Sequence, residues 1–504
     1  MSWGSILSLA KVKKQNPPDM HPQLLIALVA RFFKLPSIFF LDAWPFSAPM
    51  VVISDPQVAV NASTFGRYGL AKHSRIKKFT NYITGSKSLF TLDGTDWRAI
   101  RSMFNPAFGL GHLTSLASLI VEDCQIFCER LEDHAEQETT CLMEELGSRL
   151  TFDIIAKVVL GLNLNCQIAE NQVYDLFRAL IEWGPRTGTN NPFKLYDPRR
   201  PIMQLYYVYL LNREIRQIVR ARYQYHGSSE KHASAAVDFA LEEYSKQNGG
   251  ATNILAVNQE FQNIIVDNTK TLLFAGYDTS SSTLCYIYIL LSKHPAALSL
   301  IREEHDSTFS PNAFVAPEIL KSNPQLLYKL PYTLAVIKEA LRLYPPVSVV
   351  RDGCDEFKVP LQNGQRVSTK GFMVYINLPA IHRSEANFSS PDAFHPERFL
   401  DASSSPSDSD NPMLGSAAKS KSWFRPFNTG PHACIGQELA ILELKIALVL
   451  TIRRFNFEVD YPELVGEERK VPSEVFGDRW YQVLEGTAKP KGHAPMKVRR
   501  RKVN

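Results

Sequence analysis

The longest apolar stretch of this chain runs from Phe261 to His294, contains no proline, and ends at Pro295. A helix of this length would span roughly 50 Å. Apolar residues fall on nearly all of its sides, among them Leu272, Phe274, Leu284, Ile287 and Leu290. Because a helix that is apolar all round is buried, this pattern predicts a long helix through the core.

A second apolar helix is predicted after Cys434, in the stretch IGQELAILELKIALVLTIRRF. Apolar residues recur there at spacings of three and four, which predicts a buried face that includes Leu439, Leu442, Ile446 and Val449. Residues 39–56, by contrast, read as two short strands joined by a turn. Long helical stretches with a few short strands predict a mainly α fold with small β-sheets, of the α+β class.

The composition is that of an ordinary globular protein, with 504 residues of which 45% are hydrophobic and 21% charged. The 56 basic and 51 acidic residues give a net charge of +5, which is too balanced to indicate a nucleic-acid partner. Seven scattered cysteines, an odd number, argue against a disulfide framework and fit a reducing compartment. Residues 402–420 are rich in Ser, Asp and Pro, and we expect a disordered insertion there.

The N-terminal region has neither a secretory signal of the usual form nor an uninterrupted apolar span. Its best candidate, Leu24 to Leu41, is broken by Arg31, Lys34 and Pro36, whereas a membrane-crossing helix needs about 20 apolar residues. Apolar and amphipathic segments can bind a membrane surface without crossing it. We therefore predict that residues 1–38 form a membrane-associated segment that does not span the membrane.

Cys434 lies in the Gly- and Pro-rich loop FNTGPHACIG, immediately before the second apolar helix. Backbone N–H groups at a helix N-terminus favour negative charge, and a thiolate is a metal ligand. Gly430 and Gly436 leave room for a large flat group, on which Phe427 could pack. The alternative is a buried structural cysteine, which is the usual role of a lone Cys.

The pattern Phe-x-x-Gly-x-x-x-Cys-x-Gly resembles the haem-binding loop of the cytochromes P450. The resemblance implies that Cys434 is the thiolate ligand of haem iron, and that Phe427, Gly430 and Gly436 contact the haem. The family usually has Arg two residues before this cysteine, where the present chain has His432. His432 could still donate a hydrogen bond to a haem propionate, but it carries a full charge only when protonated.

The middle of the long helix contains the run AGYDTS, residues 275–280, which places polar residues and a glycine in an apolar surrounding. Such a local conflict in a buried helix often marks function. The run resembles the oxygen-activating motif of the P450 family. This implies that Ala275 contacts the haem, that Gly276 makes room for dioxygen, and that Asp278 and Thr279 relay protons. The structural alternative is a glycine kink with locally hydrogen-bonded side chains.

Trp97 and Arg101 lie four residues apart on a predicted helix that Asp96 could cap. In the P450 family a Trp-x-x-x-Arg pair reaches a haem propionate, which suits the two-pronged Arg guanidinium. A surface cation–π pair is the alternative. Arg351, after the Pro-Pro turn that ends a later helix, is a further candidate partner of a propionate.

Glu339 and Arg342 also share a helix face, and on a protein surface such a pair contributes little. In the P450 family this Glu-x-x-Arg pair is buried and is joined by an Arg from a Pro-Glu-Arg-Phe segment, here Arg398. A buried Glu between two Arg must be fully hydrogen-bonded. We therefore predict a structural, not a catalytic, role for these three residues.

The same resemblance assigns three less regular segments. Residues 71–94 are expected to be an irregular loop over the substrate pocket. Its basic residues are expected to face water, namely Lys72, Arg75, Lys77 and Lys78. The Pro-, Gly- and Asn-rich stretch from Gly184 to Pro201 is expected to be a lid loop. Residues 475–483 are expected to form the terminal hairpin of the fold.

The resemblance extends from about Phe39 onward, so residues 39–504 are predicted to be a P450 catalytic domain. It implies a haem b monooxygenase that inserts one oxygen atom from O2 into an apolar small organic substrate. The chain looks most like the P450s of filamentous-fungal secondary metabolism. The alternatives are a P450 that rearranges or couples substrates without net oxygen insertion, and a haem protein that only binds or senses ligands.

The electron source is expected to be a separate protein, because the chain has no dinucleotide-binding fingerprint. The resemblance implies an NADPH–cytochrome P450 reductase, with cytochrome b5 as a further candidate. Four basic residues are candidate docking contacts, namely Arg98, Lys419, Lys421 and Arg425. We also predict a monomer, bound to the cytosolic face of the endoplasmic reticulum membrane.

Overall fold

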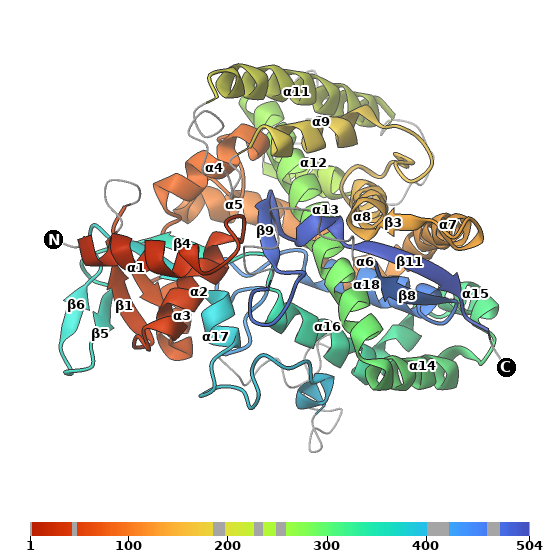
Figure 1. Ribbon diagram of the computed structural model, residues 1–504. Coiled ribbons are helices and arrows are strands. Elements are labelled where there is room, and N and C mark those ends of the chain that lie inside the picture. Colours follow the sequence, from red (N-terminus) through yellow and green to blue (C-terminus); the bar gives the residue numbers. More distant parts are fainter. Residues whose placement is uncertain are drawn as a thin grey trace.

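The structure is a computed structural model that describes residues 3–42, 48–184, 197–225, 235–247, 259–400, 423–460 and 474–502. Helices make up most of it, and the strands form small sheets (Figure 1). The predicted mainly α fold with small β-sheets is therefore confirmed. The predicted insertion at 402–420 and most of the predicted lid loop lie outside the described residues.

The helix α13 (Gln259–Lys293) runs through the middle of the helical part, as predicted (Figure 1). It ends where Pro295 starts α14 (Pro295–Phe309), because proline suits a first helical turn but not a helix interior. Helix α8 (Met143–Leu160) packs along α13, and Phe152 of α8 meets Tyr277 of α13 with ring centroids 5.3 Å apart. These contacts fix the orientation of α13 about its own axis.

Helix α18 (Gln437–Thr451) follows the Cys434 loop and is buried on all sides from Ile441 to Thr451. The sequence predicted one buried face, whereas the structure buries every face of this part of the helix. The helix packs against α7 (Ala117–Glu136), α16 (Pro331–Leu343) and α13 at once. A helix surrounded in this way needs apolar residues on every face, which its leucines and isoleucines supply.

The remaining helices are α1 (Trp3–Lys14), α2 (Pro22–Phe32), α3 (Pro56–Thr64), α4 (Ser74–Thr84), α5 (Gly94–Phe104), α6 (Leu110–Ser115), α9 (Gln172–Glu182), α11 (Arg199–Tyr225), α12 (Ala236–Gln247), α15 (Ala316–Ser322) and α17 (Leu378–His382). Helix α4 shows that residues 71–94 are not an irregular loop. Helix α5 begins one position after Asp93, so Asp96 lies in its first turn and is not its cap.

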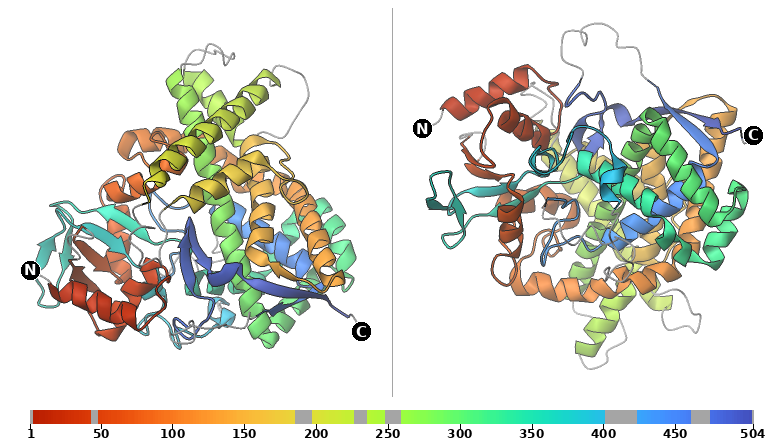
Figure 2. Two further views of the ribbon diagram at one scale, coloured as in Figure 1. Left: turned by 45° about the horizontal axis from the view of Figure 1, so that its top comes forward. Right: turned by 90° about the horizontal axis from the view of Figure 1, so that it is seen from below.

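The largest sheet joins β1 (Ile38–Leu41), β2 (Met50–Ile53), β7 (Met373–Ile376) and β4 (Val349–Asp352) in that order. Its first two strands are the predicted antiparallel pair, and β2 and β7 are parallel. A three-stranded sheet contains β3 (Thr140–Leu142), β11 (Pro495–Arg500) and β8 (Phe455–Val459), and β5 (Lys358–Pro360) pairs with β6 (Arg366–Ser368). The four-stranded sheet lies beside the helical part, with α1 and α2 against it (Figure 2).

Helix α2 packs against the rest of the chain instead of standing apart from it. Gln23 donates a hydrogen bond to the backbone oxygen of Pro345 at 3.0 Å and another to Gln482 Oε1 at 2.8 Å. Leu24 and Val29 of α2 are also buried. Among the described residues, no single helix is long and apolar enough to cross a membrane, although two sharply bent helix pairs reach that length and composition together.

The terminal hairpin consists of β9 (Gln482–Glu485) and β10 (Thr487–Pro490), a few residues later than predicted. Val475 and Asp478 form only an isolated β-bridge. The hairpin turns at Gly486, which has a positive φ of 77°. Strand β10 lies along the middle of α13, where Ser282 Oγ donates to the Ala488 oxygen at 2.7 Å.

Candidate active site

The Cys434 loop has a fixed backbone conformation. The Cys434 N–H donates to the Phe427 oxygen at 2.9 Å, and the Ala433 N–H donates to the Gly430 oxygen at 3.0 Å. Gly430 has a positive φ of 74°, and a Cβ there would lie 2.7 Å from the Ser63 oxygen. Only glycine fits this position, because both the backbone conformation and the space exclude a side chain.

The Cys434 side chain is exposed, yet enough protein surrounds it that burial raises the pKa of its thiol. The backbone N–H of Gly436 and the charge of Arg101 lower that pKa. The predicted lowering of the Cys434 pKa by the helix N-terminus is thus present, but without a bound group the effect of burial on that pKa is larger. A Cβ added at Gly436 would meet nothing within 4 Å, so open space adjoins the loop here.

Helix α5 brings Trp97 and Arg101 against the Cys434 loop. The Trp97 ring packs on His432 with ring centroids 4.1 Å apart, and Arg101 Nη1 donates to the Ala433 oxygen at 3.0 Å. Burial and the nearby cations lower the pKa of His432 to about 3, so its imidazole is neutral at physiological pH. His432 can therefore donate a hydrogen bond but cannot replace the charge of the usual Arg.

Lys72 and Arg351 supply positive charge at the same place. Their backbones form a β-bridge, and Lys72 Nζ lies 3.2 Å from Asp93 and 5.5 Å from the centre of the Trp97 ring. Lys72 is buried, which contradicts the expectation that it faces water. Sequence reasoning missed it, because no spacing pattern separates this lysine from the exposed ones nearby.

Burial lowers the pKa of Arg351 to about 10 and that of Lys72 to about 8, because Asp93 offsets only part of their desolvation. Arg351 Nε is buried and has no hydrogen-bond partner among the described residues. Buried cations in excess over anions favour an anionic ligand. The carboxylates of a haem fit this charge, and open space adjoins the Cys434 loop at Gly436.

The AGYDTS run lies in the middle of α13, as the motif predicted. Between residues 268 and 291, all side chains are buried except those of Ala275, Gly276 and Thr279. Thr279 Oγ1 donates to the Ala275 oxygen at 2.9 Å, and these two residues lie one turn apart on the same face. That face is therefore where the central helix meets open space.

The structure shows which way a side chain at Gly276 would point. A Cβ added to it would lie 2.5 Å from Ile155 Cγ1 of α8, and so would point into the α8 packing. Glycine is needed here because the two helices approach closely. The prediction that Gly276 makes room for dioxygen is thus not supported by the direction of the missing side chain.

Asp278 is fully buried, whereas Ala275 and Thr279 are not. Its Oδ2 accepts the Thr487 N–H at 2.9 Å, and its Oδ1 lies 2.8 Å from Lys489 Nζ. Successive helix residues are about 100° apart, so the carboxyl group and the Thr279 hydroxyl occupy different sides of α13. The prediction that both side chains act in one relay did not foresee this separation.

Glu339, Arg342 and Arg398 form one buried cluster. Arg342 Nε and Nη2 lie 2.7 and 2.8 Å from the two Glu339 oxygens, and Arg398 Nε lies 3.1 Å from Glu339 Oε1. The His395 N–H donates to the same carboxylate at 2.9 Å. The side chains of Glu339 and Arg342 have no exposed surface. Such complete hydrogen bonding is what a buried charge cluster requires.

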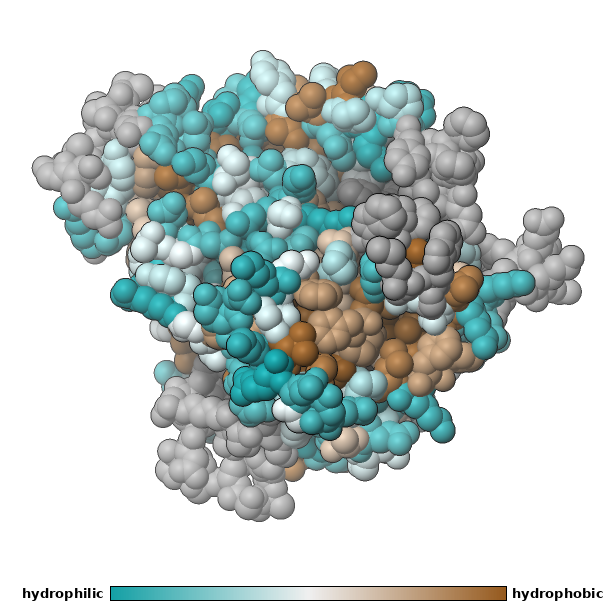
Figure 3. Space-filling view, turned by 90° about the vertical axis from the view of Figure 1, so that its left-hand side faces the viewer, coloured by the Kyte–Doolittle hydropathy of each residue, from teal (hydrophilic) through white to brown (hydrophobic). Residues whose placement is uncertain are grey.

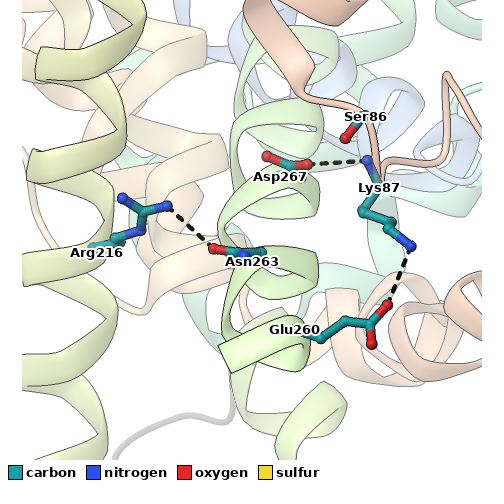
Figure 4. A pocket seen from close by; sticks show the side chains of 6 residues that line it. All are labelled: Ser86, Lys87, Arg216, Glu260, Asn263 and Asp267. Carbon is teal, nitrogen blue, oxygen red and sulfur yellow. Dashed lines mark hydrogen bonds and ion pairs between the residues drawn. The ribbon is translucent and has the colours of Figure 1, made fainter. Parts of the chain in front are cut away.

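A polar pocket of about 410 Å³ lies elsewhere, where α11 and the residues after α4 meet the first turns of α13 (Figure 4). Lys87 spans it, with its N–H on Asp267 and its ammonium on Glu260, and Arg216 binds Asn263. Asp267 precedes Thr279 by twelve residues, or about 18 Å along a helix. This charged pocket is therefore not the place where an apolar substrate would react.

Comparison with known proteins agrees with this geometry. Residues 26–472 match the family model described as Cytochrome P450. The chain is 34% identical to "Cytochrome P450 monooxygenase acrF" of Aspergillus aculeatus, over 97% of this chain and 99% of that protein. It is 30% identical to "Cytochrome P450 monooxygenase polC" of Polytolypa hystricis, over 98% of this chain and 87% of that protein.

The crystal structure of a cytochrome P450, CYP102L1, superposes with a TM-score of 0.73 at 19% identity, over 95% of this chain and 98% of that one. At this identity the likeness shows the fold alone. The chain belongs to the cytochrome P450 family. The predicted family, fold and enzyme class are confirmed.

Proposed function

We propose that this cytochrome P450 is a haem-thiolate monooxygenase that inserts one oxygen atom from O2 into an apolar small organic substrate. One observation supports the proposal most strongly. On a central helix that is buried from residue 268 to 291, only Ala275, Gly276 and Thr279 are not buried. The names of the curated relatives, both called P450 monooxygenases, support the reaction class. A role in secondary-metabolite biosynthesis is part of the proposal.

Each group of residues has a distinct task in this proposal. Cys434 would hold the iron of haem b, and Arg101, Arg351, Lys72 and His432 would hold its carboxylates. Haem, when bound, supplies the redox chemistry that cleaves dioxygen. The Thr279 hydroxyl, held toward the Ala275 oxygen, would pass protons to the reacting oxygen. The apolar core around α13 would keep bulk water from the reaction.

The direct test of the iron ligand is Cys434→Ala. The wild-type protein should bind haem and give, when reduced with carbon monoxide, the red-shifted Soret band of thiolate ligation. Cys434→Ala should lose that band, and Cys354→Ala should keep it, because Cys354 lies away from the loop on the segment after β4. A Cys434→Ala protein with the thiolate band would overturn the assignment.

The reaction itself is tested by turnover with NADPH, a P450 reductase and candidate apolar substrates. A monooxygenase consumes NADPH and O2 and yields a product heavier by one oxygen atom, which 18O2 would label. A product without the label would instead indicate rearrangement or coupling. Haem binding without NADPH consumption for any substrate would favour a ligand-binding haem protein.

The electron donor we propose is NADPH–cytochrome P450 reductase, with cytochrome b5 as an additional donor. The candidate docking contacts need one correction. Arg425 is buried and donates to Ser63 Oγ at 2.8 Å, so it holds the Cys434 loop in place and cannot touch a partner. Arg98 is exposed on α5 and remains a candidate, whereas Lys419 and Lys421 lie outside the described residues.

We also propose peripheral binding to the cytosolic face of the endoplasmic reticulum membrane, but through a different surface from the one predicted. Most apolar residues of α2 are buried in protein, although Phe32 at its end is 47% exposed. Helix α11, at the top of Figures 1 and 3, instead exposes an apolar stripe at helical spacing, made of Ile202, Leu205, Tyr206 and Tyr209, each between 53% and 73% exposed. Such a stripe can enter a lipid interface without crossing it.

A further inference from the structure

Three buried charged side chains connect the terminal hairpin to two helices. Lys489 of β10 lies 2.8 Å from Asp278 Oδ1 of α13 and also forms an ion pair with Glu144 Oε1 of α8. The three side chains are between 0% and 8% exposed. Lys489 is therefore the single ammonium group shared by two buried carboxyl groups.

The hairpin encloses the Asp278 carboxyl group from the other side as well. The Thr487 N–H donates to Asp278 Oδ2 at 2.9 Å. A Cβ at Gly486, in the turn of the hairpin, would lie only 2.8 Å from the same oxygen. Residues of β10 thus contact both carboxyl oxygens, whereas the Thr279 hydroxyl donates to the Ala275 oxygen.

The charged and titratable groups that face Asp278 come from four elements: Tyr82 of α4, Glu144 of α8, Tyr277 of α13 and Lys489 of β10. Burial raises the pKa of Asp278, and the negative charge of Glu144 raises it further. The Lys489 ammonium and a hydrogen bond from the Thr487 side chain lower that pKa. Without Lys489, the hydrogen bonds from Thr487 would have to oppose both burial and a like charge, so the carboxyl group would take up a proton.

We propose that Lys489 is a positioning residue for Asp278, which it keeps ionised and directed toward the terminal hairpin. The inference rests on the proposed function, because Asp278 matters to the reaction only if α13 relays protons. An ionised carboxyl group can accept a proton from water and release it again. A protonated carboxyl group donates one hydrogen bond and has no negative charge with which to take up a further proton. The hairpin thereby sets the state in which Asp278 enters the reaction.

The solvent end of this network is His493, after β10. His493 Nδ1 lies 3.3 Å from Glu144 Oε2, and its Nε2 lies 3.7 Å from Glu485 Oε2. These carboxylates raise the pKa of His493, and Lys489 lowers it. When His493 is protonated, Glu144 has a second positive partner and needs Lys489 less. Lys489 should then bind Asp278 more tightly at lower pH.

The test compares Lys489→Met, Lys489→Arg and Lys489→Met/Asp278→Asn in the haem-loaded protein by infrared spectroscopy. Lys489→Met should show a new C=O band of a protonated carboxylic acid, which the double variant lacks. Lys489→Arg keeps the charge and should give the wild-type spectrum. Lys445→Met is the matched control, because Lys445 is equally buried but donates to the Leu327 oxygen on another side of the core. It should show no band that depends on Asp278.

Coupling of NADPH oxidation to product gives the second readout. Lys489→Met should lower the ratio of product to NADPH to the value of Asp278→Asn, and Lys489→Arg should restore it. The absence of an Asp278-dependent band in Lys489→Met, or a Lys489→Arg variant that behaves like Lys489→Met, would overturn the proposal. If Lys489→Met does not fold, Lys489→Met/Glu144→Gln is used for the same infrared measurement. This variant leaves only the Asp278 carboxyl group without its ammonium partner.

Failure of the underlying function would look different. If Asp278→Asn itself leaves the coupling ratio unchanged, the relay through Asp278 is wrong. The infrared band would still decide whether Lys489 holds Asp278 ionised.

Discussion

Replacement of Glu339 by alanine is the most informative single test of the scaffold that holds the Cys434 loop. The side chains of Glu339 and Arg342 have no exposed surface, and the carboxylate accepts from Arg342, Arg398 and the His395 N–H. Without it, Arg342 keeps the backbone oxygens of His382, at 2.7 Å, and of residues 391 and 393, and its guanidinium carbon stays 4.7 Å from the centre of the Phe388 ring. One buried guanidinium charge would then have no counterion.

The expected loss in the free energy of unfolding is about 3–5 kcal/mol, the usual cost of breaking a buried ion pair from one side. This is a large fraction of the about 5–15 kcal/mol by which folded proteins are stable. Glu339→Ala should therefore give little folded, haem-loaded protein. Denaturant unfolding of the material that does fold should show the loss directly.

Glu318→Ala is the matched control. Glu318 pairs with Lys321 at 3.3 Å with the same three-residue spacing, but its side chain is 74% exposed. An exposed pair contributes about 0–1 kcal/mol, so this variant should unfold like the wild type. Equal stability of the two variants would refute the reasoning, because it would mean that burial of the Glu339 cluster carries no energetic weight. Glu339→Gln, which keeps the shape and loses the charge, should lie between them.

Three further predictions concern the helix, the pH response and the membrane. Thr279→Ala should keep the thiolate spectrum but yield less product and more hydrogen peroxide per NADPH. The change should be smaller than the about 10²–10⁴-fold typical of acid–base catalysis, because water can replace a hydroxyl. Thr283→Ala, which loses the same kind of hydrogen bond one turn later, is its control, and an unchanged ratio of product to NADPH in Thr279→Ala would leave Thr279 as a packing residue. Burial raises the pKa of Glu443 from 4.5 to about 8, and a hydrogen bond with Ser280 opposes the rise. Between these two pH values the folded chain keeps a proton that the unfolded chain loses. The free energy of unfolding should therefore fall as the pH rises from 4.5 to 8. Glu443→Gln should flatten that slope in denaturant unfolding, and an unaltered slope would count against a protonated Glu443. Ile202→Ser/Leu205→Ser should weaken binding to lipid vesicles, and carbonate should release the wild-type protein completely from membranes. Phe314→Ser, which changes an equally exposed residue between α14 and α15, should bind vesicles like the wild type. Equal binding of the wild type and both variants would exclude α11 as the membrane surface.

The amino-acid sequence was enough to predict the features that depend on residues near one another in the chain. The apolar run of α13 and its end at Pro295 follow from helix periodicity and from the missing N–H of proline. The Cys434 loop was recognisable because glycines at fixed distances from one cysteine leave few backbone conformations. The pairing of Glu339 with Arg342 follows from helical spacing alone.

Only the tertiary structure decided how those residues are used, because direction and burial depend on which elements meet. Sequence spacing could not show that Gly276 faces Ile155 of α8 or that Asp278 faces Lys489, which lies more than 200 positions later. It could not separate the buried Lys72 from its exposed neighbours, since a lysine is exposed by default and becomes buried only where other chain segments close over it. The same holds for α2, where Gln23 reaches Pro345 and Gln482 and most apolar residues pack against protein, while Phe32 stays 47% exposed.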